Sequence, residues 1–211
     1  MNIPVPATDP RARPVQLRGA STVAQLLDTA ALLLEELGFE RLSTNRICAA
    51  AGLTPPAIYR YFPNKYAVLK ALGERLMASQ NAALDQWVTL EFDPDDLPGS
   101  YRAMLNGQLA ATRREIAGAW IMRALHATPV LAEVRHASHA AVTDMLSAWV
   151  AEQWPHIDGD AARRRVRLMV EFGYAVIEML CERPDPDEAQ TVDDAARILA
   201  HEHAGMIAPL P

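Results

Sequence analysis

The residues Ala51-Gly52-Leu53-Thr54, followed directly by Pro55, constrain this chain more than any other part of its sequence. Gly52 has the backbone freedom that a sharp turn needs, whereas Pro55 fits the first turn of a helix but not its interior. Pro63 closes the segment soon afterwards, so the helix that follows the turn has to be short. Two short helices joined by such a turn form a helix-turn-helix, whose second helix has the geometry to enter the major groove of DNA.

Helical periodicity precedes the turn. A first helix is expected to begin near Ser21 or Thr22 and to end at Gly38. Its inward stripe is predicted to be Val23, Leu26, Leu27, Ala30, Leu34 and Leu37. A second, short helix is expected to begin at Ser43 or Thr44. Its inward residues are predicted to be Ile47, Ala50 and Ala51.

Beyond the turn, Thr54 is expected to cap the third helix, and Asn64 is expected to cap a fourth helix that reaches about residue 88. Ile58 and Phe62 lie four residues apart, so they are expected to face the first helix and hold the third helix against it. Arg60 then points away from this small core, which makes its side chain available to a partner.

The acidic stretch 91–99 interrupts the helical pattern, and four or five further helical segments follow, at about 100–113, 116–127, 130–154, 160–182 and 188–206. Ala, Leu, Arg and Glu dominate, whereas runs of alternating β-branched residues are missing. We therefore predict an all-α fold of about nine helices. It comprises a flexible arm (1–18), a three-helix helix-turn-helix domain (19–66) and a larger helical domain (67–211). The fourth helix is expected to be the only one that the two domains share.

Charge is distributed unevenly along the chain. Through Arg75 there are nine Lys and Arg residues against six Asp and Glu residues, although the whole chain has a formal net charge of −6. A basic end on an acidic body suits a protein that contacts phosphate at one end only. For Arg11, Arg13 and Arg18 of the arm, a solvated tail is favoured over a contact with a DNA groove.

Residues 44–53 (TNRICAAAGL) and 58–65 (IYRYFPNK) resemble the DNA-binding domain of the tetracycline-repressor (TetR) family. The run from Tyr59 to Phe62, with Lys65 and an apolar Leu69, is the most specific part of this resemblance. The resemblance covers about residues 20–75. It implies a homodimeric transcriptional regulator, a repressor that binds double-stranded operator DNA and is released by a small-molecule inducer.

The resemblance also implies roles for single residues. Thr44, Tyr59 and Tyr61 would hydrogen-bond to phosphates, and Lys65 would add a charged phosphate contact. Arg60 and Ala57 would read base edges. The predicted DNA-contacting set is Thr44, Arg46, Thr54, Pro55, Pro56, Ala57, Tyr59, Arg60, Tyr61 and Lys65. Two alternatives stay open: the Tyr61 ring packs on the fourth helix, and Arg46 is a solvated surface charge. Pro56 departs from the polar residue that the family often has at this position, so no particular base contact is assigned to it.

In this family the larger domain dimerises through its last two helices and encloses an inducer pocket. The segment 160–182 fits this because it has two apolar stripes. The first stripe consists of Val166, Met169, Val170, Gly173, Ile177 and Leu180. The second stripe consists of Leu168, Phe172, Ala175 and Met179. In the last helix, the stripe expected to join the dimer interface is Val192, Ala195, Ala196, Leu199 and His203. Candidate pocket residues are Tyr101, Met104, Trp120, Met122, Met145, Trp149 and Phe172, with ordinary core packing as the alternative.

Other classes of function find little support in the sequence. Cys48 and Cys181 lack the spacing of a metal site or a disulfide framework, which fits reduced thiols in the cytoplasm. No signal peptide, membrane-spanning run, phosphate loop or nucleophile elbow is visible, so we expect no membrane segment, no catalysis, no cofactor and no metal. The competing hypotheses are a helical small-molecule binding protein or enzyme whose helix-turn-helix no longer binds DNA, and a purely structural helical dimer.

Overall fold

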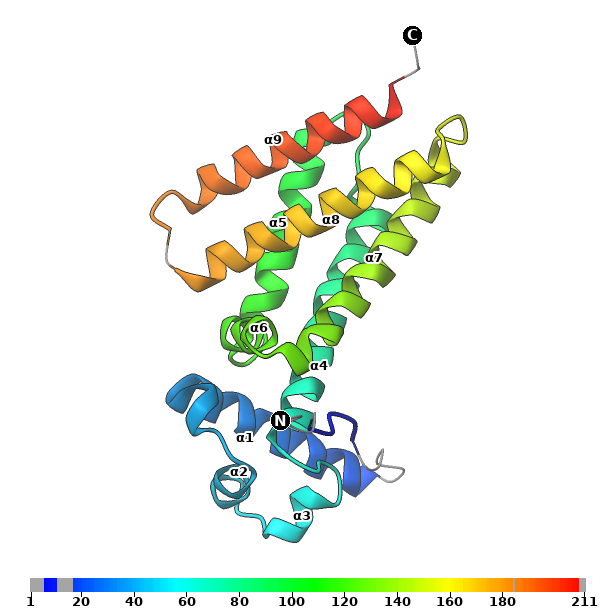
Figure 1. The fold of residues 1–211 in the computed structure, drawn as a ribbon. Helices are drawn as coiled ribbons and strands as arrows, with labels where there is room; N and C mark the ends of the chain where they lie inside the picture. The colour runs from blue at the N-terminus through cyan, green and yellow to red at the C-terminus, as the bar shows by residue number, and fades with distance from the viewer. Residues whose placement is uncertain (1–5, 11–16, 184, 209–211) are drawn as a thin grey trace, which may run out of the picture. The chain divides into compact units, whose positions relative to one another are not determined.

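The computed structural model describes residues 6–10, 17–183 and 185–208, and every regular element in those ranges is helical. The helices are α1 (Leu17–Arg41), α2 (Thr44–Ala50), α3 (Pro55–Tyr59), α4 (Lys65–Gln86), α5 (Leu97–Arg114), α6 (Gly118–Ala127), α7 (Ala132–Gln153), α8 (Gly159–Glu182) and α9 (Glu188–Ile207) (Figure 1). A π-helix η1 (Trp87–Glu91) follows α4, and a 3-10 helix η2 (Pro129–Leu131) precedes α7. The all-α prediction is confirmed.

The predicted arm is described only in part: Arg11, Arg13 and the Arg18 side chain lie outside the described residues. Residues 6–10 contact the first turns of α4, because Asn64 donates to the Ala7 carbonyl (2.8 Å) and Lys70 donates to the Asp9 carboxylate (2.5 Å). The expected start of the first helix near residue 21 was too late, since α1 begins at Leu17.

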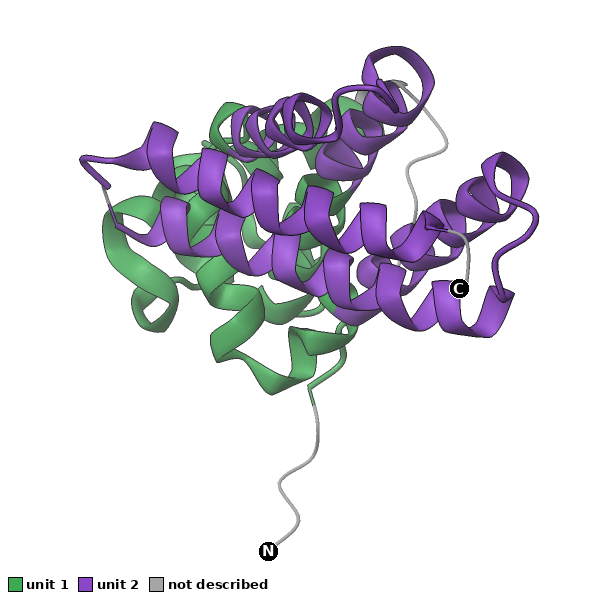
Figure 2. Cartoon of the chain, turned by 90° about the horizontal axis from the view of Figure 1, so that it is seen from above, with its two compact units in different colours: residues 1–77, 113–135 green, residues 78–112, 136–211 purple. Residues whose placement is uncertain are grey.

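The chain forms two compact units, residues 1–77 with 113–135 and residues 78–112 with 136–211 (Figure 2). In the first unit α6 packs on α1, and Arg75 Nε lies 3.1 Å from the Glu115 carboxylate. The sequence boundary expected at residue 66 therefore falls inside this unit. Because α4, α5 and α7 each cross a unit boundary, the expectation that α4 alone is shared was wrong.

The core of the first unit is apolar and lies around α1. Its largest buried side chains are Leu26, Leu34, Leu42, Ile47, Ile58, Phe62, Leu69, Leu72, Leu76 and Ile121. Gly38, with φ 74°, breaks α1 near the position where the sequence placed its end. In α2 the prediction of an inward Ala50 was wrong, because the buried face consists of Thr44, Ile47 and Cys48. These residues follow the i, i+3, i+4 rule, and Ala50 lies off that stripe.

The second unit has an aromatic cluster, which consists of Trp87, Phe92, Tyr101, Trp149, Trp154 and His203. Within it the rings of Phe92 and Trp149 meet edge to face with centroids 4.7 Å apart, an arrangement that aromatic pairs favour. The Trp87 indole N–H donates to the Ser100 carbonyl at 2.8 Å, so this buried polar group is satisfied.

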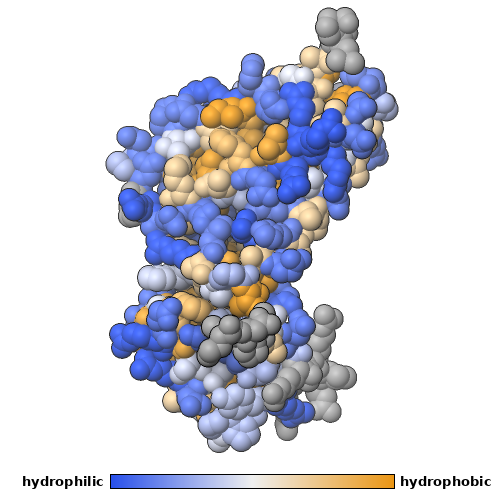
Figure 3. All heavy atoms as spheres, viewed as in Figure 1, coloured by the Kyte–Doolittle hydropathy of each residue, from blue (hydrophilic) through white to orange (hydrophobic). Residues whose placement is uncertain are grey.

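Helices α8 and α9 run side by side in the second unit (Figure 1). The first apolar stripe of α8 is turned inward as predicted, whereas Leu168, Ala175 and Met179 of the second stripe are exposed and Phe172 is half-buried. The α9 stripe assigned to a dimer interface is instead buried inside its own unit, and Ile198 is the large apolar residue that α9 exposes. Figure 3 shows hydrophobic side chains gathered over these two helices. Among the described helices, none is long and apolar enough to span a membrane.

Candidate nucleic-acid interface and cavity

The two short helices of the first unit meet at a pair of hydroxyl groups. Thr44 begins α2, Tyr59 ends α3, and their hydroxyl oxygens share a hydrogen bond of 3.0 Å. Thr44 is 9% exposed and Tyr59 is 38% exposed, so the pair lies at the edge of the core with one side open to solvent. Hydroxyl groups in such a position are common partners of DNA phosphates.

The turn between these helices is held from several directions. Gly52 has φ 66°, the left-handed conformation for which the sequence selects glycine. The Leu53 N–H donates to the Cys48 carbonyl (2.9 Å), and Gln25 of α1 donates to the Ala51 carbonyl (2.9 Å). Ser43 caps α2 by accepting from the Arg46 N–H, as predicted. Thr54 occupies the N-cap position of α3, but its side chain makes no capping hydrogen bond there.

Helix α3 has one buried and one exposed face. Ile58 is buried, as is Phe62 just beyond the helix, which confirms the predicted anchor. The exposed residues are Thr54, Pro55, Pro56, Tyr59 and Arg60, and Ala57 is half-buried. The Arg60 guanidinium lies 5.7 Å from the centroid of the Tyr61 ring. Arg46 on α2 is exposed as well. A short helix thus projects a row of mostly polar and proline side chains.

Two residues of the predicted set are turned inward. Tyr61 is only 6% exposed, which favours the alternative that its ring packs in the core. Lys65 is half-buried: its ammonium donates to the Phe39 carbonyl at 3.0 Å and lies 4.2 Å from the centroid of the Phe39 ring. In this arrangement the Lys65 charge stabilises the end of α1 rather than an exposed surface.

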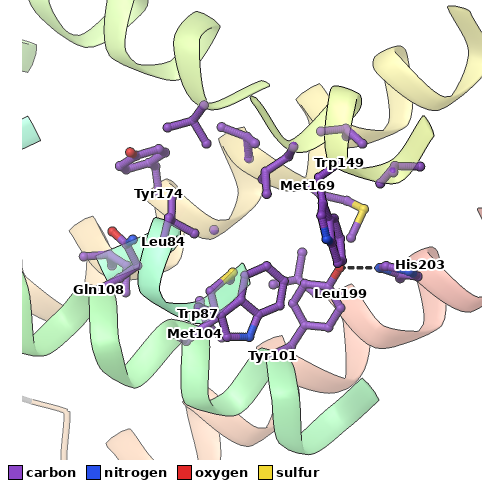
Figure 4. Close-up of a pocket in the computed structure, with 18 of the residues that line it drawn as sticks. Leu84, Trp87, Tyr101, Met104, Gln108, Trp149, Met169, Tyr174, Leu199 and His203 are labelled. Carbon is purple, nitrogen blue, oxygen red and sulfur yellow. Dashed lines mark hydrogen bonds between the residues drawn. The ribbon is translucent and has the colours of Figure 1, made fainter. Parts of the chain in front are cut away.

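The second unit contains a cavity of about 50 Å³ that is lined by helices α4, α5, α7, α8 and α9 and by η1 (Figure 4). Tyr101, Met104 and Trp149 line it, as predicted. Its other lining residues are Leu84, Trp87, Leu105, Gln108, Val142, Leu146, Val150, Val166, Met169, Val170, Gly173, Tyr174, Ile177, Leu199, His203 and Met206.

Four candidate pocket residues are absent from this lining. Trp120 and Met122 belong to α6 in the first unit, where the Trp120 ring lies beside Arg123. Met145 and Phe172 fall on other helix faces, since the cavity meets α7 at Val142, Leu146, Trp149 and Val150 and meets α8 along its first apolar stripe. Sequence reasoning missed Gln108 and His203, two polar residues on otherwise apolar helix faces.

Polar groups in the cavity lining are few. His203 is 1% exposed, and its Nδ1 lies 2.6 Å from the Tyr101 hydroxyl. Burial lowers the pKa of His203 to about 4 and raises the pKa of Tyr101, so both groups are uncharged near neutral pH. The Gln108 amide donates to the Gln80 carbonyl at 2.7 Å. Within the described ranges, no three His, Cys, Asp or Glu side chains are grouped to hold a metal ion.

Comparison with known sequences finds a family match inside the first unit. Residues 26–72, from α1 into α4, match the profile of the bacterial regulatory proteins of the tetR family. Residues 26–72 are a TetR-family domain. Over 91 residues it is 32% identical to the tetracycline repressor protein class C of Escherichia coli, covering 43% of this chain and 37% of that protein. The matched part thus spans little more than a third of that relative.

Solved structures extend the likeness beyond residues 26–72 to most of the fold. A TetR-family transcriptional regulator from Streptomyces coelicolor superposes with a TM-score of 0.64 at 22% identity, covering 88% of this chain and 99% of that one. A structure described as the SmeT–triclosan complex gives 0.64 at 20% identity, covering 90% and 99%. At these identities the likeness shows a shared fold.

Proposed function

We propose that this chain is a transcriptional repressor that reads operator DNA with α3 and the start of α2. The single observation that carries the proposal is the two-sided character of α3. Its anchor, Ile58, is buried, whereas Pro56, Tyr59 and Arg60 project outward. A short helix held in this way suits the major groove. The proposed contacts are Thr44, Arg46, Pro56, Ala57, Tyr59 and Arg60.

The proposed repressor is a homodimer that forms through α8 and α9. Leu168 is 68% exposed on α8, and Met179 on α8 and Ile198 on the neighbouring α9 are exposed as well. Large apolar side chains on a surface of this kind are expected to be covered by a partner. A two-fold dimer also supplies a second reading helix, which a pseudo-palindromic operator requires.

The proposed signal is a small, largely apolar molecule that enters the cavity of the second unit and relieves operator binding. Aromatic and methionine side chains line this cavity, and such side chains suit adaptable ligand sites. The structural relative described with triclosan supports a ligand of this size and character. We place the regulator in the cytoplasm, where operator DNA and reduced Cys48 and Cys181 are both expected.

One observation favours a second candidate, a small-molecule binding protein that no longer binds DNA. Tyr61 is buried and Lys65 is engaged with Phe39, so two of the expected phosphate contacts are not presented at the surface. Electrophoretic mobility shift separates the two functions. The probe is duplex DNA from upstream of the chain's own gene, titrated with wild-type protein at several salt concentrations.

For the repressor, we expect salt-dependent retardation by the wild-type protein. Tyr59→Ala should weaken binding about tenfold, because it removes a phosphate contact and loosens α2 from α3. Arg114→Ala is the control, since Arg114 is exposed at the end of α5 in the same unit and its loss removes a positive charge, which Tyr59→Ala does not. Equal retardation by Tyr59→Ala and Arg114→Ala, or no retardation by the wild-type protein, would favour the second candidate.

A further inference from the structure

The outward face of α8 is apolar in its middle. Leu168, Ala175 and Met179 are exposed there, and they are separated by seven and four positions, so they share one face of the helix. Phe172 is half-buried beside them. Large apolar side chains that share an exposed face are expected to be covered by another protein surface.

Helix α9 adds Ile198 to this apolar region. Residues 183–187 join α8 to α9, so the end of α8 lies near the start of α9. The Arg165 guanidinium near the start of α8 donates to the Glu202 and Gly205 carbonyls near the end of α9, so the two helices run antiparallel (Figure 1). Ile198, which is exposed, therefore lies beside the middle of α8.

The exposed charges of α8 differ between its two halves. Arg164 and Arg167 are exposed in the N-terminal half. In the C-terminal half, Glu182 is exposed and Glu178 is half-buried. Glu171, near the middle, is half-buried, and its carboxylate lies 3.0 Å from a histidine of α7. The outward face therefore has a basic part and an acidic part, on either side of the apolar middle.

These charges are opposite at matching positions. Arg164 and Glu182 each lie nine positions from Gly173, which is about 13 Å along the helix axis. The outermost exposed charges, Asp160 in the first turn and Arg183 just beyond the last turn, are opposite as well. A rotation by 180° about an axis through the middle of this face therefore brings each charge near one of opposite sign.

Two copies of this face can meet in two orientations. In an antiparallel pair, Arg164 lies beside Glu182 of the partner subunit, and Leu168 lies beside Met179 of the partner subunit. In a parallel pair, Arg164 lies beside Arg164 of the partner subunit, and Glu182 lies beside Glu182 of the partner subunit. Opposite charges across an interface favour the first orientation, and like charges disfavour the second. Because a two-fold dimer uses the same patch on both subunits, the antiparallel pair forms each contact twice.

We infer that α8 packs antiparallel on the α8 of a second copy of this chain, with Arg164 paired to Glu182 of the partner subunit at both ends of an apolar centre. This inference rests on the proposed function, since it gives the orientation and the residue pairs of the proposed homodimer. It also makes the interface selective, because a related chain with other charges at these positions would leave Arg164 or Glu182 without its match.

Reversal of the two charges tests this pairing, with the dimer dissociation constant measured by analytical ultracentrifugation. Arg164→Glu and Glu182→Arg each place like charges together at both symmetry-related contacts. We expect either single variant to raise the dissociation constant about tenfold. The double variant restores opposite charges and should return to within about threefold of wild type. In a parallel pair the single variants would leave the dissociation constant nearly unchanged, because each contact already joins like charges.

Two controls separate this pairing from other effects of charge. The single variants change the net charge in opposite directions, so a weakening common to both does not come from net charge. Arg114→Glu is the matched control for charge reversal, since Arg114 is exposed at the end of α5, outside α8 and α9, and it should keep the wild-type dissociation constant. Circular dichroism checks that each variant is folded. An equimolar mixture of the single variants, whose heterodimer pairs opposite charges, replaces the double variant if that variant does not fold.

The outcomes distinguish the pairing from the dimer itself. A wild-type dimer whose dissociation constant is unchanged in both single variants overturns the inference alone. So does a double variant that stays as weak as the single variants, or an equal weakening by Arg114→Glu. A wild-type protein that sediments as a monomer overturns the proposed homodimer and the inference with it.

Discussion

The Lys65 ammonium at the start of α4 is 4.2 Å from the centroid of the Phe39 ring and donates to the Phe39 carbonyl, so it closes the end of α1. Lys65→Met keeps most of the stem but removes this charged hydrogen bond. We expect the free energy of unfolding to fall by about 1–2 kcal/mol, measured by urea denaturation.

The same variant distinguishes a structural lysine from one that contacts phosphate. With Lys65 engaged inside the unit, the slope of log binding constant against log salt should be the same for Lys65→Met and wild type. A slope lower by about one unit would instead assign Lys65 to a phosphate, as the family resemblance implied.

Arg60 is the exposed cation of α3, and we expect it to read one base pair. The wild-type protein should bind the operator more tightly than an operator substituted at that base pair. In Arg60→Ala this difference in binding free energy should be smaller by about 1–3 kcal/mol. Competition binding with a panel of singly substituted duplexes measures this loss. If every duplex is weakened equally, Arg60 contacts phosphate only.

Leu168 tests the proposed dimer. Leu168→Glu places a charge on the exposed stripe of α8, and we expect it to raise the dimer dissociation constant at least about tenfold in analytical ultracentrifugation. Leu90→Glu is the matched control, because Leu90 is 80% exposed in η1, outside α8 and α9. A wild-type protein that sediments as a monomer at micromolar concentration would contradict the proposal.

Burial of His203 makes the stability depend on pH. Its pKa is lowered from 6.5 to about 4, so below pH 6.5 the unfolded chain takes up a proton that the folded protein does not. Stability is therefore highest above pH 6.5 and is lost as the pH falls towards 4. Between pH 7.5 and pH 5 this group should remove about 2 kcal/mol from the free energy of unfolding.

The comparison with His203→Phe isolates this contribution. The variant should lose less stability over the same interval, which denaturant titrations at pH 7.5 and pH 5 will show. Glu202, whose pKa is lowered by the Arg165 hydrogen bond, acts mainly below pH 4.5 and contributes little in this interval. Equal pH dependence of the two proteins would mean that His203 titrates normally in the folded state.

Gly52 tests the geometry of the turn. Gly52→Ala forces a side chain into φ 66°, although nothing lies within 4 Å of the added Cβ, so any loss comes from the backbone. We expect a loss of about 1 kcal/mol. Gly107→Ala is the opposite control, because Gly107 lies inside α5 with open space around it and should gain up to about 1 kcal/mol. Thermal melts report both changes.

Periodicity and turn chemistry predicted the helices well, because Gly38, Gly52, Pro55 and the capping residues Ser43 and Asn64 act locally. The wheel of α3 also divided Ile58 from Arg60 correctly. Local rules failed where packing decides. In α2 the buried position expected for Ala50 is taken by Cys48. Helix α1 begins at Leu17, before the capping pattern at Thr22 from which its start was predicted.

The cavity was harder to predict because its lining comes from distant parts of the chain. Tyr101 and His203 are separated by 102 positions, and nothing local announces that their side chains meet. Trp120 and Phe172 were predicted to line the cavity because of their residue type alone, but neither side chain is part of the lining. His203 was treated as one member of an apolar stripe, although a histidine in such a stripe needs a hydrogen-bond partner and that requirement was the available signal.

The chain passes between the two units within α4, α5 and α7, and this limits how the DNA-binding helices can be exchanged between related proteins. The first unit is not a contiguous stretch of sequence, since α6 and the Glu115 partner of Arg75 return to it after the chain has visited the second unit. If two relatives exchanged their N-terminal DNA-binding helices by a single crossover, α1 would come from one protein and α6 from the other. The packing of α6 on α1 would then be mismatched. Recombination that preserves stability therefore has to carry residues 113–135 together with the N-terminal helices.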